Sequence, residues 1–85
     1  MKYKVVFKPS VAKQIHRLDK KEQKKIIAVA ESLASNPRPY GYKKLVDKEM
    51  LYRLRVGNYR IIYVIFDDVL VINILQIKKR NERTY

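Results

Sequence analysis

Three arginines stand close together in the second half of the chain, at Arg53, Arg55 and Arg60. The pair Gly57-Asn58 between them is typical of a two-residue hairpin turn, so we expect Arg55 to lie directly opposite Arg60. Arg53 falls on the same face, because side chains alternate along a strand. Like charges opposed at a Cβ separation of roughly 5 Å repel each other, and the stretch 51–66 contains no acidic residue. The pattern predicts an external anion, and phosphate suits guanidinium groups best.

The end of the chain supports the same interpretation. The basic segment Lys78-Lys79-Arg80 follows the last apolar run directly, and Tyr85 closes the tail. A tyrosine there can stack on a nucleobase, or it can be an ordinary frayed terminus. For the arginines, the alternative is that they spread apart in solvent or that one pairs with Asp47 or Glu49.

Composition points to the same class of partner. The 85 residues include 20 Lys and Arg against 8 Asp and Glu, which gives a net charge of +12. A field of this sign attracts polyanions, and nucleic acid is the leading candidate. The alternative is an ordinary small basic domain whose lysines are solvated. At 47% hydrophobic residues, the chain is rich enough in apolar side chains to fold.

Several other chemistries lack the residues they need. The chain has no Cys, which excludes disulfides and thiolate zinc sites, and His16 is its one imidazole. Neither a His-rich metal site nor a Ser-His-Asp triad is therefore available. Lysines interrupt the N-terminus, unlike a signal peptide, and no apolar run reaches membrane-spanning length. We expect a cytoplasmic protein without a metal or cofactor and without membrane contact.

The elements that position these residues follow from periodicity and turn signals. Asp19 with Glu22 three residues later is an Asp version of the capping box, and Ser10 is the expected cap of an earlier helix. We expect strands over 3–7, 52–56, 59–66 and 69–77 and a short strand at 43–45. The fold class is α+β over residues 1–85, in the order β-α-α-β-β-β. A helical hairpin packs on one face of a mostly antiparallel, twisted sheet.

The last two strands raise a question of register. Both have apolar residues at both parities, which is typical of central strands covered on both faces. A straight register from a turn at Asp67-Asp68 pairs Arg60 with Leu75 and sends Arg80 to the opposite face. For Arg80 to join Arg60, the last strand must twist, bulge or end before it, and we expect that it does.

The stretches 51–63 and 77–85 resemble the RelE/ParE toxin superfamily. The first matches its central hairpin motif, lyRlRvGdYRiiY, and the second matches its end, a GKR or HRR segment followed by a Tyr. The order of elements agrees as well, so the resemblance covers nearly the whole chain. It implies a toxin of a type II toxin–antitoxin system, namely a ribosome-dependent endoribonuclease that cleaves messenger RNA in the A site.

The resemblance also implies roles for individual residues. Arg53 and Arg55 stand where RelE toxins carry basic residues, often lysines, that flank the scissile phosphate. Arg60 corresponds to the arginine that neutralises this phosphate. Arg80 corresponds to the residue that protonates the leaving group, and Tyr85 to the tyrosine that stacks on or orients the message. Further RNA-binding residues are expected at Lys43, Lys44, Lys78, Lys79 and Arg83.

The implied partners are the ribosome, messenger RNA and a RelB-like, acidic antitoxin that binds a toxin otherwise monomeric. An apolar patch of Ile62, Val64 and Val71 on the open sheet face favours such a cover. Two other functions stay open. One is a ParE-like toxin that inhibits DNA gyrase, although ParE toxins lack the basic set and the closing Tyr. The other is a non-catalytic nucleic-acid-binding module.

Overall fold

A computed structural model describes residues 2–45 and 51–79, and within them the chain forms two helices and five strands. In chain order these are β1 (Lys4–Phe7), α1 (Pro9–His16), α2 (Lys20–Ser32), β2 (Lys43–Lys44), β3 (Leu51–Val56), β4 (Tyr59–Phe66) and β5 (Val71–Lys79). The predicted α+β class and order of elements are confirmed, including the short strand that follows the helices. Neither of these helices is long and apolar enough to cross a membrane.

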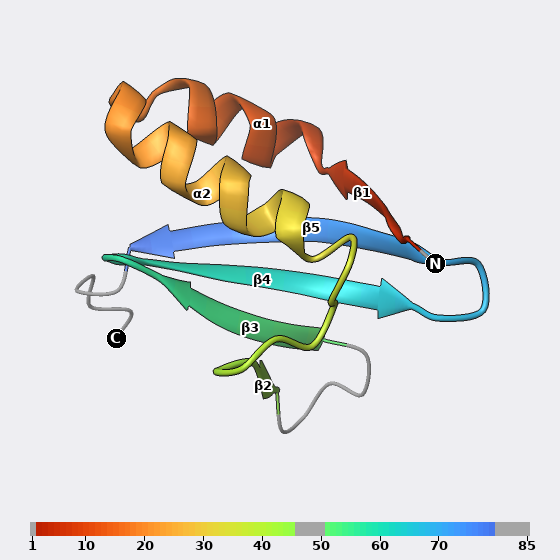
Figure 1. The fold of residues 1–85 in the computed structure, drawn as a ribbon. Coiled ribbons are helices and arrows are strands. Elements are labelled where there is room, and N and C mark those ends of the chain that lie inside the picture. Colours follow the sequence, from red (N-terminus) through yellow and green to blue (C-terminus); the bar gives the residue numbers. More distant parts are fainter. Residues whose placement is uncertain (1, 46–50, 80–85) are drawn as a thin grey trace.

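The five strands form one sheet in the order β1-β5-β4-β3-β2. β1 runs parallel to β5, and the other three pairings are antiparallel. The first strand of the chain therefore lies beside the last, and the helices occupy the connection that follows it (Figure 1). β4 and β5 are central strands, as their apolar sequences predict.

Both helices lie on one face of the sheet (Figure 1), and the core fills the space between the two layers. Its buried side chains are Val11, Ile15, Ile26, Ala30, Leu33, Leu54, Val56, Tyr59, Ile61, Tyr63, Ile65, Ile72, Ile74 and Ile77. The strand residues of alternate parity, including Arg55 and Arg60, point to the opposite face. The described helices cover one face only. On the other face the strand side chains are half-buried or exposed apart from Val64, which is 7% exposed, so the predicted cover of both faces is found only in part.

The two helices begin differently. Asp19 caps α2 as predicted, since its Oδ1 accepts a hydrogen bond from the backbone N–H of Glu22 at 3.1 Å. The predicted cap at Ser10 is wrong, because Lys8 is the N-cap of α1 and Pro9 opens its first turn. Proline suits that position, where its fixed φ fits a helix and its missing N–H has no partner to lose.

The turn between β4 and β5 is longer than the predicted Asp67-Asp68 pair. It takes four residues, Asp67 to Leu70, and β5 begins at Val71. Leu70 adopts a φ of 56°, a left-handed conformation that is costly for a branched side chain. Its carbonyl accepts a hydrogen bond from the backbone N–H of Lys4 at 2.8 Å. The turn is thus tied to the start of β1.

Candidate nucleic-acid interface

The hairpin of β3 and β4 brings two arginines together. Arg55 pairs with Arg60 across the turn Gly57-Asn58, and this predicted register is confirmed. Gly57 has a φ of 58°, while Asn58 does not have a positive φ. A positive φ at the first central position alone fits a type II′ turn, which favours glycine there. The turn therefore sets Arg55 and Arg60 side by side on the face that points away from the helices.

A bulge in β5 places a third basic side chain beside them. The pairing of β4 with β5 shifts between Ile62 and Tyr63, with Leu75 as the extra residue. Beyond this shift Arg60 pairs with Lys78, whereas the register set by Phe66 and Val71 would pair it with Ile77 without the bulge. The predicted irregularity of the last strand is confirmed, and it lies at Leu75. Arg60 thus has a basic residue opposite it on each neighbouring strand.

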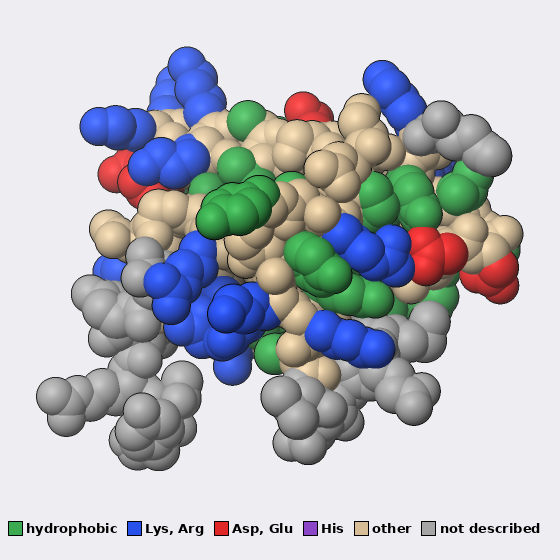
Figure 2. All heavy atoms as spheres, turned by 60° about the horizontal axis from the view of Figure 1, so that its bottom comes forward, with side chains coloured by type: hydrophobic (Ala, Val, Ile, Leu, Met, Phe, Trp, Pro, Cys, Tyr) green, Lys and Arg blue, Asp and Glu red, His purple; other side chains and the backbone are tan. Residues whose placement is uncertain are grey.

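The edge of the sheet extends the set further. β2 pairs Lys43 with Arg53, which lies two residues before Arg55 on the same face. Four adjacent strands thus contribute the cationic cluster, which consists of Lys43, Arg53, Arg55, Arg60 and Lys78. Figure 2 shows Lys and Arg side chains gathered toward the left of the view, the end at which the β3–β4 hairpin lies in Figure 1.

The cationic cluster lacks internal compensation within the described residues. The ion pair found in that part of the chain joins Arg38 to Asp67, and it involves no member of the cluster. Arg60 is half-buried, and its Nε is fully buried without an acceptor among the described residues. A buried donor left without a partner costs about 1–3 kcal/mol. An anion supplied from outside would screen the mutual repulsion of the cluster.

A hollow of about 350 Å³ opens beside the cluster at the edge of β3. Its basic lining comes from Lys43, Arg53 and Arg55, and Tyr40 and Gly41 complete it together with Leu54. β2 pairs only as far as Arg53, so the loop before it borders the hollow. The site therefore combines positive charge with an aromatic side chain.

Two predicted RNA-binding lysines lie elsewhere. Lys44 pairs with Tyr52 and Lys79 pairs with Tyr59, and both tyrosines belong to the helix-covered face. Lys44 and Lys79 therefore leave the sheet on that side, away from the cationic cluster. Their contact with RNA remains a prediction.

Several other predicted residues lie outside the described ranges. These are Arg80, Arg83 and Tyr85 in the tail, together with Asp47 and Glu49, the carboxylates considered as internal partners. The expected place of Arg80 beside Arg60 remains a prediction, and so do the roles of the closing tyrosine and of Arg83.

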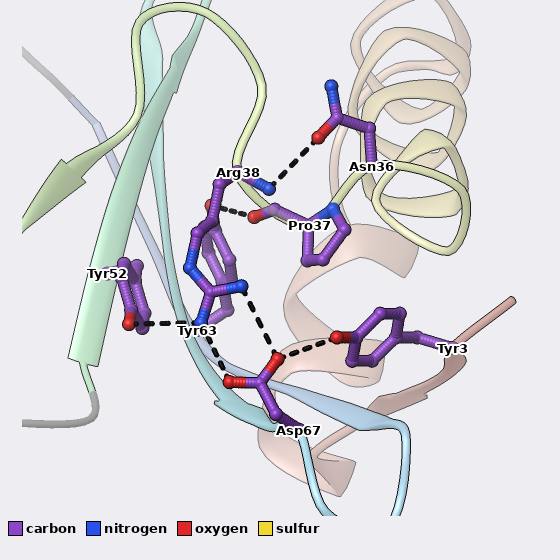
Figure 3. A network of polar contacts seen from close by, with 7 residues as sticks. All are labelled: Tyr3, Asn36, Pro37, Arg38, Tyr52, Tyr63 and Asp67. Atoms are coloured by element: carbon purple, nitrogen blue, oxygen red, sulfur yellow. Dashed lines mark hydrogen bonds and ion pairs between the residues drawn. The ribbon is translucent and has the colours of Figure 1, made fainter. Parts of the chain in front are cut away.

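A network that sequence reasoning missed holds the loop between α2 and β2 (Figure 3). Arg38 Nη2 donates to Asp67 Oδ2 at 2.8 Å, and its guanidinium lies 5.3 Å from the ring centroid of Tyr52. Asp67 also accepts from the hydroxyl of Tyr3 at 2.6 Å, while the Tyr63 hydroxyl donates to the Pro37 carbonyl at 2.9 Å. We call Tyr3, Arg38, Tyr52, Tyr63 and Asp67 the Arg38 clamp. In the sequence, Pro37-Arg38-Pro39 indicates only that a helix cannot continue, and it gives no sign of this network.

The ionisation of the Arg38 clamp reflects its contacts. Hydrogen bonds from Arg38 and from Tyr3 hold the pKa of Asp67 below its usual range. The same bond to Asp67 raises the pKa of Arg38, and burial raises the pKa of Tyr63 to about 12. The clamp thus keeps its ion pair at neutral pH, and the raised pKa values of Tyr3 and Tyr63 keep these two hydroxyls as donors.

Lys25 adds a basic side chain from the helix layer. It is exposed on α2, and its Nζ lies 3.1 Å from the place a Cβ would take on Gly57. The hairpin turn that aligns Arg55 with Arg60 is therefore covered by a cation. Nothing in the sequence distinguishes Lys25 from its lysine neighbours on α2.

Comparison with known proteins shows which family the chain belongs to. The family model of the ParE toxin of type II toxin–antitoxin systems matches residues 5–84. A curated protein of Methanocaldococcus jannaschii, named "Putative toxin RelE1", is 32% identical over 83 residues, covering 94% of this chain and 92% of that protein. The chain belongs to the RelE/ParE superfamily of toxins from type II toxin–antitoxin systems.

Solved structures share this fold. RelE in the RelE–RelB complex of Pyrococcus horikoshii OT3 superposes with a TM-score of 0.86 at 31% identity, over 98% of this chain and 100% of that one. The isolated RelE toxin of E. coli shares the fold, with a TM-score of 0.80 at 17% identity over 96% and 88% of the two chains. The structure is RelE-like.

Proposed function

We propose that this chain is an endoribonuclease that cleaves messenger RNA in the ribosomal A site and thereby inhibits translation. The cationic cluster carries the proposal. Arg60 stands between Arg55 and Lys78 with a buried Nε–H that no described residue accepts. The fold gains no stability from opposing like charges. An RNA phosphate supplies the missing negative charge, and the exposed side chains of Arg55 and Lys78 can reach it.

The proposed reaction uses the RNA's own nucleophile. The ribose 2′-oxygen forms a bond to the adjacent phosphorus, and the bond from phosphorus to the 5′-oxygen of the next nucleotide breaks. One proton leaves the 2′-hydroxyl and one is gained by the departing 5′-oxygen. The products are a 2′,3′-cyclic phosphate and a 5′-hydroxyl. Negative charge builds on the phosphorane between these two events.

The arginines act electrostatically in this scheme. Guanidinium groups held in place stabilise the phosphorane, and losing one such group commonly costs about 10²–10³ in rate. Arginine keeps its proton, so Arg53, Arg55 and Arg60 are poor general bases. The resemblance assigns proton donation to Arg80 and orientation of the message to Tyr85. Because an arginine is an equally poor acid, the proton that the 5′-oxygen gains comes from Tyr85 or from solvent in this proposal. The ribosome contributes by holding the message in line.

The proposed regulator is a RelB-like, acidic antitoxin. The Pyrococcus horikoshii RelE that resembles this chain was solved in complex with RelB, which supports such a partner. An acidic chain suits the net charge of +12. Ile62 and Val71 are half-buried on the sheet face that the described helices leave open, as expected for a partner surface, whereas Val64 on that face is already buried at 7% exposure. We propose that the toxin alone is a monomer that acts in the cytoplasm.

A second candidate function is inhibition of DNA gyrase. The family model that matches is that of the ParE toxin, and this favours gyrase as a target to be tested alongside the ribosome. The cationic cluster favours RNA cleavage, because half-buried Arg60 faces Arg55 and Lys78 and has no carboxylate partner among the described residues.

One paired assay tests the proposal. Purified protein is added to ribosomes carrying a defined message, and in parallel to gyrase supercoiling a plasmid. We expect the message to be cut within the A-site codon, leaving 2′,3′-cyclic phosphate and 5′-hydroxyl ends, while supercoiling continues. If supercoiling stops in the gyrase reaction and the message stays intact in the ribosome reaction, the protein is a gyrase inhibitor. If both reactions are unaffected, a non-catalytic nucleic-acid-binding module is left.

A further inference from the structure

Tyr40 stands out among the tyrosines of the described chain. Its exposed fraction is 104%, whereas Tyr59 is 9% exposed and Tyr63 is fully buried. A single exposed ring is common on protein surfaces and needs no explanation by itself. The neighbourhood of Tyr40 sets it apart, since it lines the same hollow as Lys43, Arg53 and Arg55.

The turn that carries Tyr40 is held firmly on both sides. Before it, the Arg38 clamp fixes the loop through the ion pair of Arg38 and the hydrogen bond to the Pro37 carbonyl. Within it, the backbone N–H of Tyr42 donates to the Pro39 carbonyl at 3.0 Å. After it, the ring of Tyr42 lies 5.8 Å from that of Tyr52, measured between centroids. The backbone under Tyr40 is thus ordered before any ligand arrives.

This combination defines the chemistry of a ligand. The basic lining of the hollow suits a phosphate, and an exposed ring on an ordered turn offers a flat apolar face. Single-stranded RNA presents both a charged backbone and unstacked bases, and proteins bind it by pairing cations with aromatic platforms. A small anion would contact the basic side chains and not the ring.

We propose that Tyr40 stacks on a base of the RNA strand next to the phosphate held by Arg55. Arg55 grips the backbone while the ring fixes the orientation of the neighbouring nucleotide, so that the strand enters the cationic cluster in one register. Tyr40 is a binding residue in this scheme, and it takes no part in proton transfer. The inference rests on the proposed RNA cleavage and names the contact that positions its substrate.

The test compares two substitutions at this position in ribosome-dependent cleavage. Tyr40→Ala removes the ring, and we expect kcat/KM to fall roughly 5- to 100-fold, the range found when a base loses one aromatic partner. Tyr40→Phe keeps the ring and is expected to stay within about twofold of the wild type. Val69→Ala is the control, since Val69 is 62% exposed in the turn at the far end of β4.

A message with abasic nucleotides next to the cut makes the test specific. At the position where Tyr40 stacks, an abasic nucleotide should lower kcat/KM of the wild type as much as Tyr40→Ala lowers it on the normal message. Combining the abasic nucleotide with Tyr40→Ala should lower kcat/KM no further. If Tyr40→Ala and the wild type have equal kcat/KM, the Tyr40 inference is wrong but the proposed function stands. The same holds if the losses from Tyr40→Ala and from the abasic nucleotide add at both flanking positions. A wild type that leaves the message whole overturns the proposed function and this inference together. Tyr40→Ala that cuts normally but binds antitoxin weakly would assign the ring to the partner instead.

Discussion

At the scale of residues, Arg38 and Arg60 are both half-buried arginines, but the first faces a carboxylate and the second faces other cations. Arg38 shares its charge with Asp67 and serves the fold. Arg60 faces Arg55 and Lys78 and has a buried Nε–H without an acceptor among the described residues. The position of Arg60 followed from the sequence, because a two-residue turn fixes the register beside it. The partner of Arg38 did not, because the two side chains meet from separate loops.

The like charges of Arg55 and Arg60 are expected to lower the free energy of unfolding. Replacing Arg55 by Glu turns a like-charge pair into an opposite-charge pair, which is worth roughly 0.2–1 kcal/mol across two strands. We expect Arg55→Glu to raise the free energy of unfolding while lowering message cleavage at least 100-fold. Chemical denaturation and the ribosome assay measure the two effects. Arg17→Glu, on the exposed end of α1, is the matched charge change, and a loss of stability specific to Arg55→Glu would count against the account.

At the scale of elements, short connections decide where the site residues lie. The Gly57-Asn58 turn could be predicted because two-residue turns demand particular residues. The β4–β5 turn could not, because Leu70 adopts a left-handed conformation that its residue type disfavours. The need to align the last strand predicts a twist, a bulge or an early end, but that it is a bulge at Leu75 depends on packing that the sequence does not reveal. Proline at the first helical position displaced the expected Ser10 cap.

The Arg38 clamp holds the loop that carries Tyr40, and its strength depends on pH. Because the pKa of Asp67 is lowered in the fold, its contribution is present above the ordinary carboxyl pKa of about 3.9 and is lost as pH falls through the lower folded value. We expect Asp67→Asn to unfold more easily than the wild type at pH 7. Denaturation at a series of pH values should show this difference shrinking below about pH 4. A constant difference would mean that the charge of Asp67 has no part in the clamp.

At the scale of the whole molecule, positive charge is spread more widely than the site. The exposed lysines of α2 lie on the helix layer, whereas the cationic cluster lies on the opposite face of the sheet. A net charge of +12 raises the rate of encounter with any polyanion and falls off with salt. Chemistry requires charge at one place. Composition alone is enough to predict a polyanionic partner. The position of the cationic cluster depends on how four strands pair, which composition does not contain.

Single-turnover cleavage on ribosomes by Arg60→Ala and Arg17→Ala separates these two roles of charge. Each variant loses one positive charge, and only Arg60 belongs to the cationic cluster. We expect Arg60→Ala to cleave about 10²–10³ times more slowly than the wild type, with the same affinity for the ribosome as Arg17→Ala and no loss of thermal stability. Arg17→Ala is expected to cleave at the wild-type rate. Equal cleavage rates for the two variants would contradict the claim that the cluster acts on the scissile phosphate.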